Sequence, residues 1–98
     1  MATAIRVSET GGPEVLELHT VDEVAPGPGE IWLEQEAIGV NFLDVTQRKG
    51  AAPLPLPGGL GLEGAGRVIR VGAGVSHVVE GDRVAYATGP LGSYASAR

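Results

Sequence analysis

Residues 39–66 decide the fold, and they read GVNFLDVTQRKG, then AAPLPLP, then GGLGLEGAG. A β-strand pattern ends at Gly39 and Val40, and a short polar segment follows it. Asn41 is suited to cap one short helix over residues 41–48, with Asp44 near the positive helix end. The segment therefore predicts a strand, one short helix and a long irregular connection.

Three prolines follow the helix and predict that no regular strand pairing occurs beside them. They are Pro53, Pro55 and Pro57. Five glycines then fall within residues 58–66. We expect them to let backbone pass close to backbone or ligand, with left-handed dihedral angles at some of them.

Alternating apolar and polar residues predict short strands on both sides of this segment. The first two form a hairpin around the turn Gly11-Gly12-Pro13. Five strands are expected, and a sixth begins near the end of the chain: residues 3–8, 14–21, 30–40, 65–71, 84–88 and 93–97. Short strands separated by Gly/Pro turns indicate a mainly β fold, a small barrel or sandwich.

The composition of the chain excludes several classes of function. A chain of 98 residues is one domain with one core, and the absence of cysteine excludes disulfides and thiolate chemistry. The net charge is −5 and the cationic residues form no basic patch, which argues against nucleic-acid binding. Apolar runs are far shorter than the roughly 20 residues that cross a membrane. The N-terminus shows no export signal, so we expect a cytoplasmic protein without a membrane partner.

One motif is misleading. Residues 59–64 match G-x-G-x-x-G letter for letter. A dinucleotide fingerprint needs a strand before it and a helix after it, whereas here a proline-rich loop precedes and a β-branched segment follows. We therefore expect no Rossmann domain within these residues.

The order of several short motifs resembles a known family. Asn41-Phe42-Leu43-Asp44 followed by Gly61-Leu62-Glu63-Gly64-Ala65-Gly66 resembles the substrate-side domain of zinc-free medium-chain dehydrogenases/reductases. The closest likeness is to the NADPH:quinone oxidoreductases of the zeta-crystallin-like group. It extends from residues 11–16 through 81–84 to Ser93-Tyr94. The resemblance implies a GroES-like, partly open β-barrel with one short helix after residue 40.

The same resemblance implies that residues 1–98 are one GroES-like domain, the N-terminal part of a longer enzyme or a truncated product of one. Later segments would complete the barrel, and a Rossmann domain would follow. That absent domain would hold most of the NADPH, and the full-length enzyme would tend to form a homodimer.

Metal binding is not expected. In zinc-dependent relatives, a cysteine and a histidine stand where this chain has Asn41 and Leu62, and neither residue suits catalytic zinc. His19 and His77 are the only histidines, and we interpret both as solvated surface residues. Chemistry without a Lewis acid fits the reduction of an electron-poor quinone.

The resemblance implies that Asn41, Phe42, Thr46 and Leu62 line the nicotinamide pocket, with Asn41 and Thr46 orienting substrate and nicotinamide. Thr46 stands where several quinone reductases of this group carry a tyrosine, and it covers less area. Ala51 and Ala52 are small where an aromatic residue is common, so a roomier pocket is expected.

Supporting roles are expected for Asp44, Glu63, Gly61, Gly64 and Gly66. Asp44 either caps the helix or supports the site, and Glu63 is expected to accept hydrogen bonds from backbone or an arginine and fix its loop. Two neighbouring cations, Arg48 and Lys49, either meet a cofactor phosphate or solvate the turn, and we favour solvation.

Three functions remain open. The favoured one is the nicotinamide- and substrate-side domain of an NADPH-dependent quinone oxidoreductase, inactive when alone. A zinc-free enoyl reductase acting on a thioester is the second. A stand-alone GroES-like module that binds a partner without catalysis is the third.

Overall fold

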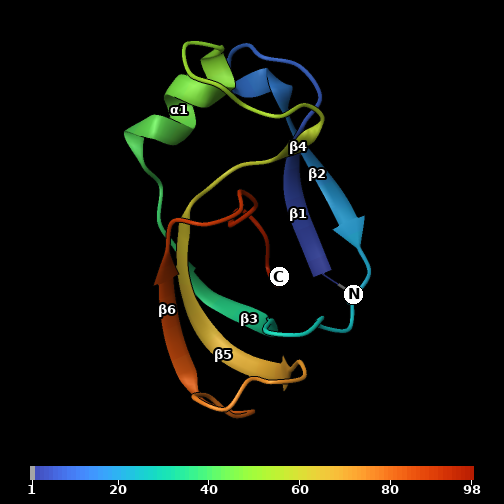
Figure 1. The fold of residues 1–98 in the computed structure, drawn as a ribbon. Coiled ribbons are helices and arrows are strands. Elements are labelled where there is room, and N and C mark those ends of the chain that lie inside the picture. Colours follow the sequence, from blue (N-terminus) through green and yellow to red (C-terminus); the bar gives the residue numbers. More distant parts are fainter. Residues whose placement is uncertain (1) are drawn as a thin grey trace.

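Two three-stranded antiparallel sheets form the fold in the computed structural model, which describes residues 2–98 (Figure 1). The first has the order β2-β1-β4 and the second β3-β5-β6. The elements are β1 (Ala2–Val7), the 3-10 helix η1 (Pro13–Val15), β2 (Leu16–Val21), β3 (Ile31–Ile38), α1 (Phe42–Lys49), β4 (Gly58–Gly59), β5 (Glu63–Val71) and β6 (Arg83–Ala87). The predicted mainly β fold with one short helix is confirmed.

The first sheet begins with the predicted hairpin, in which Ile5 of β1 lies opposite Leu18 of β2. Its core is small: Val7, Val15 and Leu60 are buried together, and Leu54 and Tyr94 pack against them. The side chains of β2 lie mostly outside this core, and Leu18 is 72% exposed.

The second sheet is held together by β5, which pairs with both β3 and β6. Leu33 of β3 lies opposite Val68 of β5, and both are buried. The pairing shifts register between Trp32 and Leu33 and again between Gln35 and Ala37. Irregularities of this kind bend a strand, which lets β3 curve.

One prediction about pairing was wrong and another was right. The prolines do not exclude strand pairing, because β4 follows Pro57 directly and pairs with Arg6 and Val7 of β1. A proline removes only its own N–H group, and the glycines after it keep theirs. The G-x-G-x-x-G motif leads into strand β5 rather than a helix, so the dinucleotide interpretation fails as expected.

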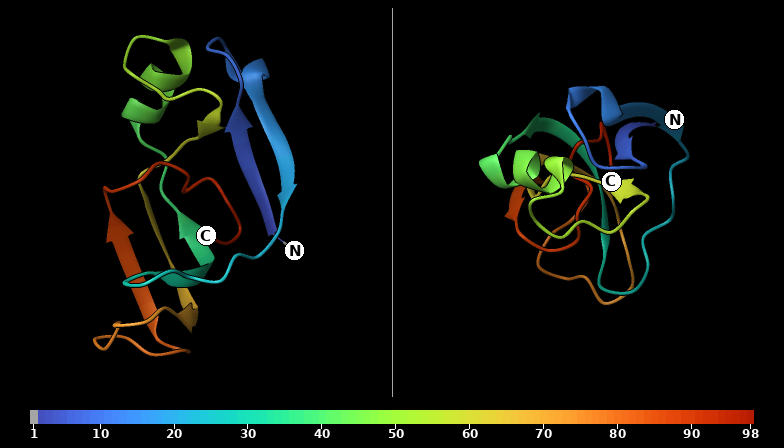
Figure 2. Two further views of the ribbon diagram at one scale, coloured as in Figure 1. Left: turned by 45° about the vertical axis from the view of Figure 1, so that its right-hand side comes forward. Right: turned by 90° about the horizontal axis from the view of Figure 1, so that it is seen from above.

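The segment after β6 is not a strand, contrary to prediction. It makes one isolated bridge to each sheet, Ala95 with Ala4 and Ala97 with Glu34. The left-hand view in Figure 2 shows this segment, in red, running between the two sheets. Alternation over residues 93–97 was misleading because Ala95 and Ala97, two residues apart, pair with different sheets.

A polar cluster fastens this segment to the second sheet. The Tyr86 hydroxyl lies 2.8 Å from both Gln35 Oε1 and Ser93 Oγ. The Gln35 amide donates to the carbonyls of Ser93 and Ala95 at 2.8 and 2.9 Å. The Arg98 guanidinium covers the Tyr86 ring and donates to Ser93 Oγ at 2.9 Å.

Candidate functional site

The N-terminus of α1 carries the first part of the candidate site. Asn41 is the N-cap in extended conformation and forms a capping box with Asp44. The Asp44 carboxylate accepts the Asn41 backbone N–H at 3.0 Å, and the Asn41 side chain faces the Asp44 backbone N–H. The predicted cap is therefore confirmed, and it fixes both side chains relative to the helix.

Glu63 begins β5 and reaches the same helix end. Its Oε2 accepts a hydrogen bond from the Asn41 amide, Nδ2, at 3.0 Å. Gly39 leaves room for this carboxylate, because a Cβ there would overlap the Glu63 side chain. The partner of Glu63 is thus an asparagine amide rather than the arginine considered from the sequence.

Asp44 is the buried centre of this arrangement, with 2% of its surface exposed. Its Oδ2 also accepts the hydroxyl of Tyr94 at 2.7 Å, whereas its Oδ1 has no hydrogen-bond partner among residues 2–98. A hollow of about 280 Å³ opens beside it. The hollow is lined by Leu16, Val40, Asp44, Val45, Arg48, Leu60 and Tyr94.

The other sequence-predicted contact residues lie around the helix end with different exposures. Phe42 is 83% exposed, and Leu62 is half-buried. The Thr46 hydroxyl donates to the Phe42 carbonyl at 3.0 Å, one turn back along the helix. Asn41 and Phe42 therefore present an amide and an aromatic ring at one helix end.

Arg48 does not simply solvate the turn, which corrects the sequence-based interpretation. Its Nη1 donates to the Gly11 carbonyl at 2.7 Å, and the Gly11 N–H donates to the Arg48 carbonyl at 2.8 Å. Lys49 is exposed, as expected. Arg48 thus ties α1 to the turn before β2, a structural role that the sequence reading did not include.

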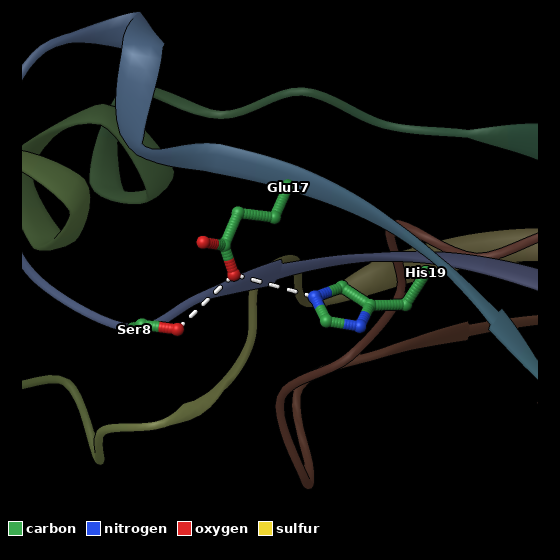
Figure 3. A network of polar contacts seen from close by, with 3 residues as sticks. All are labelled: Ser8, Glu17 and His19. Atoms are coloured by element: carbon green, nitrogen blue, oxygen red, sulfur yellow. Dashed lines mark hydrogen bonds and ion pairs between the residues drawn. The ribbon is translucent and has the colours of Figure 1, made fainter.

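The two histidines lie on the surface, as predicted. His19 forms a small exposed network in which Glu17 Oε1 contacts both His19 Nε2, at 3.3 Å, and Ser8 Oγ, at 3.1 Å (Figure 3). The carboxylate, not the imidazole, occupies the middle. The Ser8 hydroxyl therefore donates to a carboxylate of lowered pKa, which is a much weaker base than the imidazole that activates a serine nucleophile. The network lowers the pKa of Glu17 mainly through the His19 hydrogen bond.

No three His, Cys, Asp or Glu side chains come together as a metal-binding group in residues 2–98. The same part of the chain contains no helix with the length and apolarity needed to span a membrane.

The glycines predicted to support the site each accommodate a different neighbour. Gly61 has a φ of +99°, and a Cβ there would lie 2.7 Å from the Tyr94 ring. Gly64 makes room for the side chains of Gln35 and Tyr86, and Gly66 for the backbone of residues 34 and 35. They therefore allow close packing around the candidate site.

Sequence reasoning missed Tyr94 as part of the site. It lies 50 residues from Asp44, and the sequence analysis named it only as part of a strand and as the end of the resemblance. Two features of the sequence could have pointed to Tyr94: it is one of only two tyrosines, and it lies in a Gly/Ser-rich segment.

Stability above pH 10 is expected to depend on Tyr94. Burial, the Asp44 hydrogen bond and the Asp44 charge raise the pKa of Tyr94 above its ordinary value. A raised folded-state pKa gives stability that is complete below the unfolded value of about 10 and is lost as pH rises above it. The loss from this group stays below about 1 kcal/mol per pH unit, because Tyr94 is partly exposed and solvent screens its contact with Asp44. Urea unfolding at pH 8 to 11 checks this, because Tyr94→Phe should show the smaller decline. Equal declines would contradict it.

Comparisons with known proteins agree with this fold. The family model described as the alcohol dehydrogenase GroES-like domain matches residues 27–97. Quinone oxidoreductase of Pseudomonas aeruginosa is 53% identical over 95 residues, which are 96% of this chain and 29% of that protein. 2-Haloacrylate reductase of Burkholderia is 40% identical, across 100% of this chain and 31% of that protein.

A solved structure is similar throughout. The crystal structure of Escherichia coli quinone oxidoreductase complexed with NADPH superposes with a TM-score of 0.94 at 46% identity, over 98% of this chain and 30% of that one. The chain thus spans about 30% of the length of the relatives it matches.

Proposed function

Because the chain belongs to the alcohol dehydrogenase GroES-like domain family, in its zinc-free medium-chain dehydrogenase/reductase branch, we propose that it forms the nicotinamide- and substrate-facing side of an NADPH-dependent quinone oxidoreductase. The Asn41–Glu63 contact supports this proposal, because Asn41, which by the resemblance stands where zinc-dependent relatives carry a cysteine ligand, holds a neutral amide in a fixed orientation.

The residues at the end of α1 fit a nicotinamide ring better than a phosphate. The Asn41 amide uses one Nδ2 hydrogen on Glu63, which leaves the other hydrogen for a carbonyl group. Phe42 is exposed and offers an apolar face. The nearby cation Arg48 is already bonded to Gly11, so the phosphates would be held by another part of the enzyme.

Bound NADPH would supply the reducing equivalents. The chain's own residues orient the reactants and exclude water. Asn41, held from one side by the cap and from the other by Glu63, aligns the ring that it contacts, and Phe42 covers an edge of the acceptor. Thr46 remains in contact with the helix carbonyl and contributes shape rather than a proton. We also propose a cytoplasmic homodimer as the full-length form.

A chimera tests the proposal. This chain replaces the matching segment of Escherichia coli quinone oxidoreductase, and NADPH oxidation is followed with 1,4-benzoquinone and with crotonyl thioester. We expect quinone reduction within about 10-fold of the parent enzyme, since the two folds superpose closely and the reactants should be aligned alike. The 98-residue chain alone should be inactive and should bind NADPH more weakly than micromolar.

Reduction of only the thioester would instead support the second candidate, an enoyl reductase. One observation favours that alternative: the chain is 40% identical to 2-haloacrylate reductase, whose name indicates an activated C=C substrate. A chimera that folds but reduces neither acceptor would contradict both enzymatic proposals and leave the partner-binding module.

A further inference from the structure

Tyr94 contacts three parts of the chain that are distant in sequence. Its N–H donates to the Leu60 carbonyl at 3.0 Å, and its carbonyl accepts the Ile5 N–H at 2.7 Å. Its ring lies against Gly61, where a Cβ would be only 2.7 Å away. The backbone of Tyr94 is therefore fixed to β1 and to the glycine-rich segment before its side chain reaches α1.

The hydroxyl of Tyr94 acts on the same oxygen that holds the helix cap. Asp44 Oδ2 accepts the Tyr94 hydroxyl at 2.7 Å and the Asn41 backbone N–H at 3.0 Å. Asp44 is buried, and its other oxygen has no partner in the described part of the chain. A buried carboxylate with so few donors is positioned strongly by each of them.

We infer that Tyr94 is a positioning residue for the candidate site: its hydroxyl fixes Asp44, Asp44 fixes the backbone of Asn41, and the Asn41 amide is thereby held at Glu63. A catalytic role for this series of hydrogen bonds rests on the proposed function. The hydrogen bonds themselves do not depend on it. The raised pKa of Tyr94 has the same physical origin, because burial and the adjacent Asp44 carboxylate both favour the protonated phenol that donates.

The contacts of a second tyrosine provide a matched control. The Tyr86 hydroxyl also hydrogen-bonds to polar partners, Gln35 and Ser93, and within residues 2–98 it makes no hydrogen bond to α1. Tyr94→Phe and Tyr86→Phe each remove one half-buried hydroxyl and keep the ring in place. A difference between the two variants at α1 that exceeds their difference in global stability therefore reports positioning.

Hydrogen exchange measured by NMR on the 98-residue chain tests the inference directly. In Tyr94→Phe, the Asn41 backbone N–H and side-chain amide should exchange about 10-fold faster, the factor expected for loss of a charge-assisted hydrogen bond. In Tyr86→Phe, both rates should stay within about 2-fold of the original. Unchanged Asn41 rates in Tyr94→Phe, or an equal change in both variants, would overturn the inference.

Activity of the chimera adds a separate readout. Tyr94→Phe should lower kcat/KM for quinone about 10-fold, mainly through kcat, because misalignment weakens transition-state contacts more than binding. Tyr86→Phe should leave it within 2-fold. If the original chimera is inactive, the proposed function fails, and the exchange rates at Asn41 still decide whether Tyr94 positions it.

Discussion

Replacing Gly66 with alanine is expected to destabilise the domain by at least about 3 kcal/mol, the upper end of the usual cost of overpacking. Gly66 is buried in the middle of β5. An added Cβ would overlap the Glu34 carbonyl oxygen and lie 2.8 Å from the Gln35 Cα. Both neighbours are backbone atoms of β3, so no side-chain rotation relieves the clash.

A control variant separates this clash from ordinary glycine effects. Gly74 has a φ of +81°, with nothing within 4 Å of an added Cβ. Gly74→Ala should therefore cost only the strain of a left-handed residue, about 1 kcal/mol. Thermal unfolding should show Gly66→Ala melting at least about 12 °C lower than the unmodified chain. A Gly66→Ala variant as stable as Gly74→Ala would show that β3 moves freely away from β5.

The clash also affects the site. Glu63 begins the strand that contains Gly66, and its carboxylate holds the Asn41 amide. A displaced β5 would therefore misplace Glu63. Residual folded Gly66→Ala protein should show faster exchange of the Asn41 amide as well as lower stability.

Much of the fold could be predicted because its signals are local. Alternation predicted β1, β3, β5 and β6 within a few residues, and the turn at Gly11-Gly12-Pro13 predicted the first hairpin. Asn41 and Asp44 predicted the helix start, because a capping box involves residues three apart.

The parts that were missed depend on contacts without a local signal. Strand β4 consists of Gly58 and Gly59, which carry no side chains and therefore no alternation. The segment after β6 bridges two sheets, at Ala95 and at Ala97, so no single period describes it. Such pairings are set by tertiary packing rather than by propensity.

In the candidate site, too, residues with a local sequence signal were predicted and a residue that acts through a long-range contact was not. The resemblance selected Asn41, Glu63 and Asp44, and the structure brings these three together. It did not select Tyr94, because its link to Asp44 spans 50 residues and depends on the path of the chain after β6. Long-range hydrogen bonds of this kind leave no pattern in one sequence.

The second large effect is expected at Asn41. Asn41→Ala removes the amide and weakens the helix cap, which costs about 1 kcal/mol of stability. Asn41→Ser keeps a good capping residue and removes only the amide that donates to Glu63. If the oriented amide aligns the reactants, both variants should lose about 100-fold in kcat/KM, the cost of misplaced or missing orienting contacts.

Comparison of the two variants distinguishes alignment from stability. Circular dichroism should show Asn41→Ser unfolding close to the original protein and Asn41→Ala somewhat earlier. A loss of activity that follows the loss of stability would indicate that Asn41 matters only as a cap.

The most direct measurement is therefore kcat/KM for benzoquinone in the chimera, with and without Asn41→Ser, at a temperature where both proteins are folded. We predict a loss of about 100-fold that added zinc does not reverse. Activity within 2-fold of the original would contradict the central role of the Asn41–Glu63 contact.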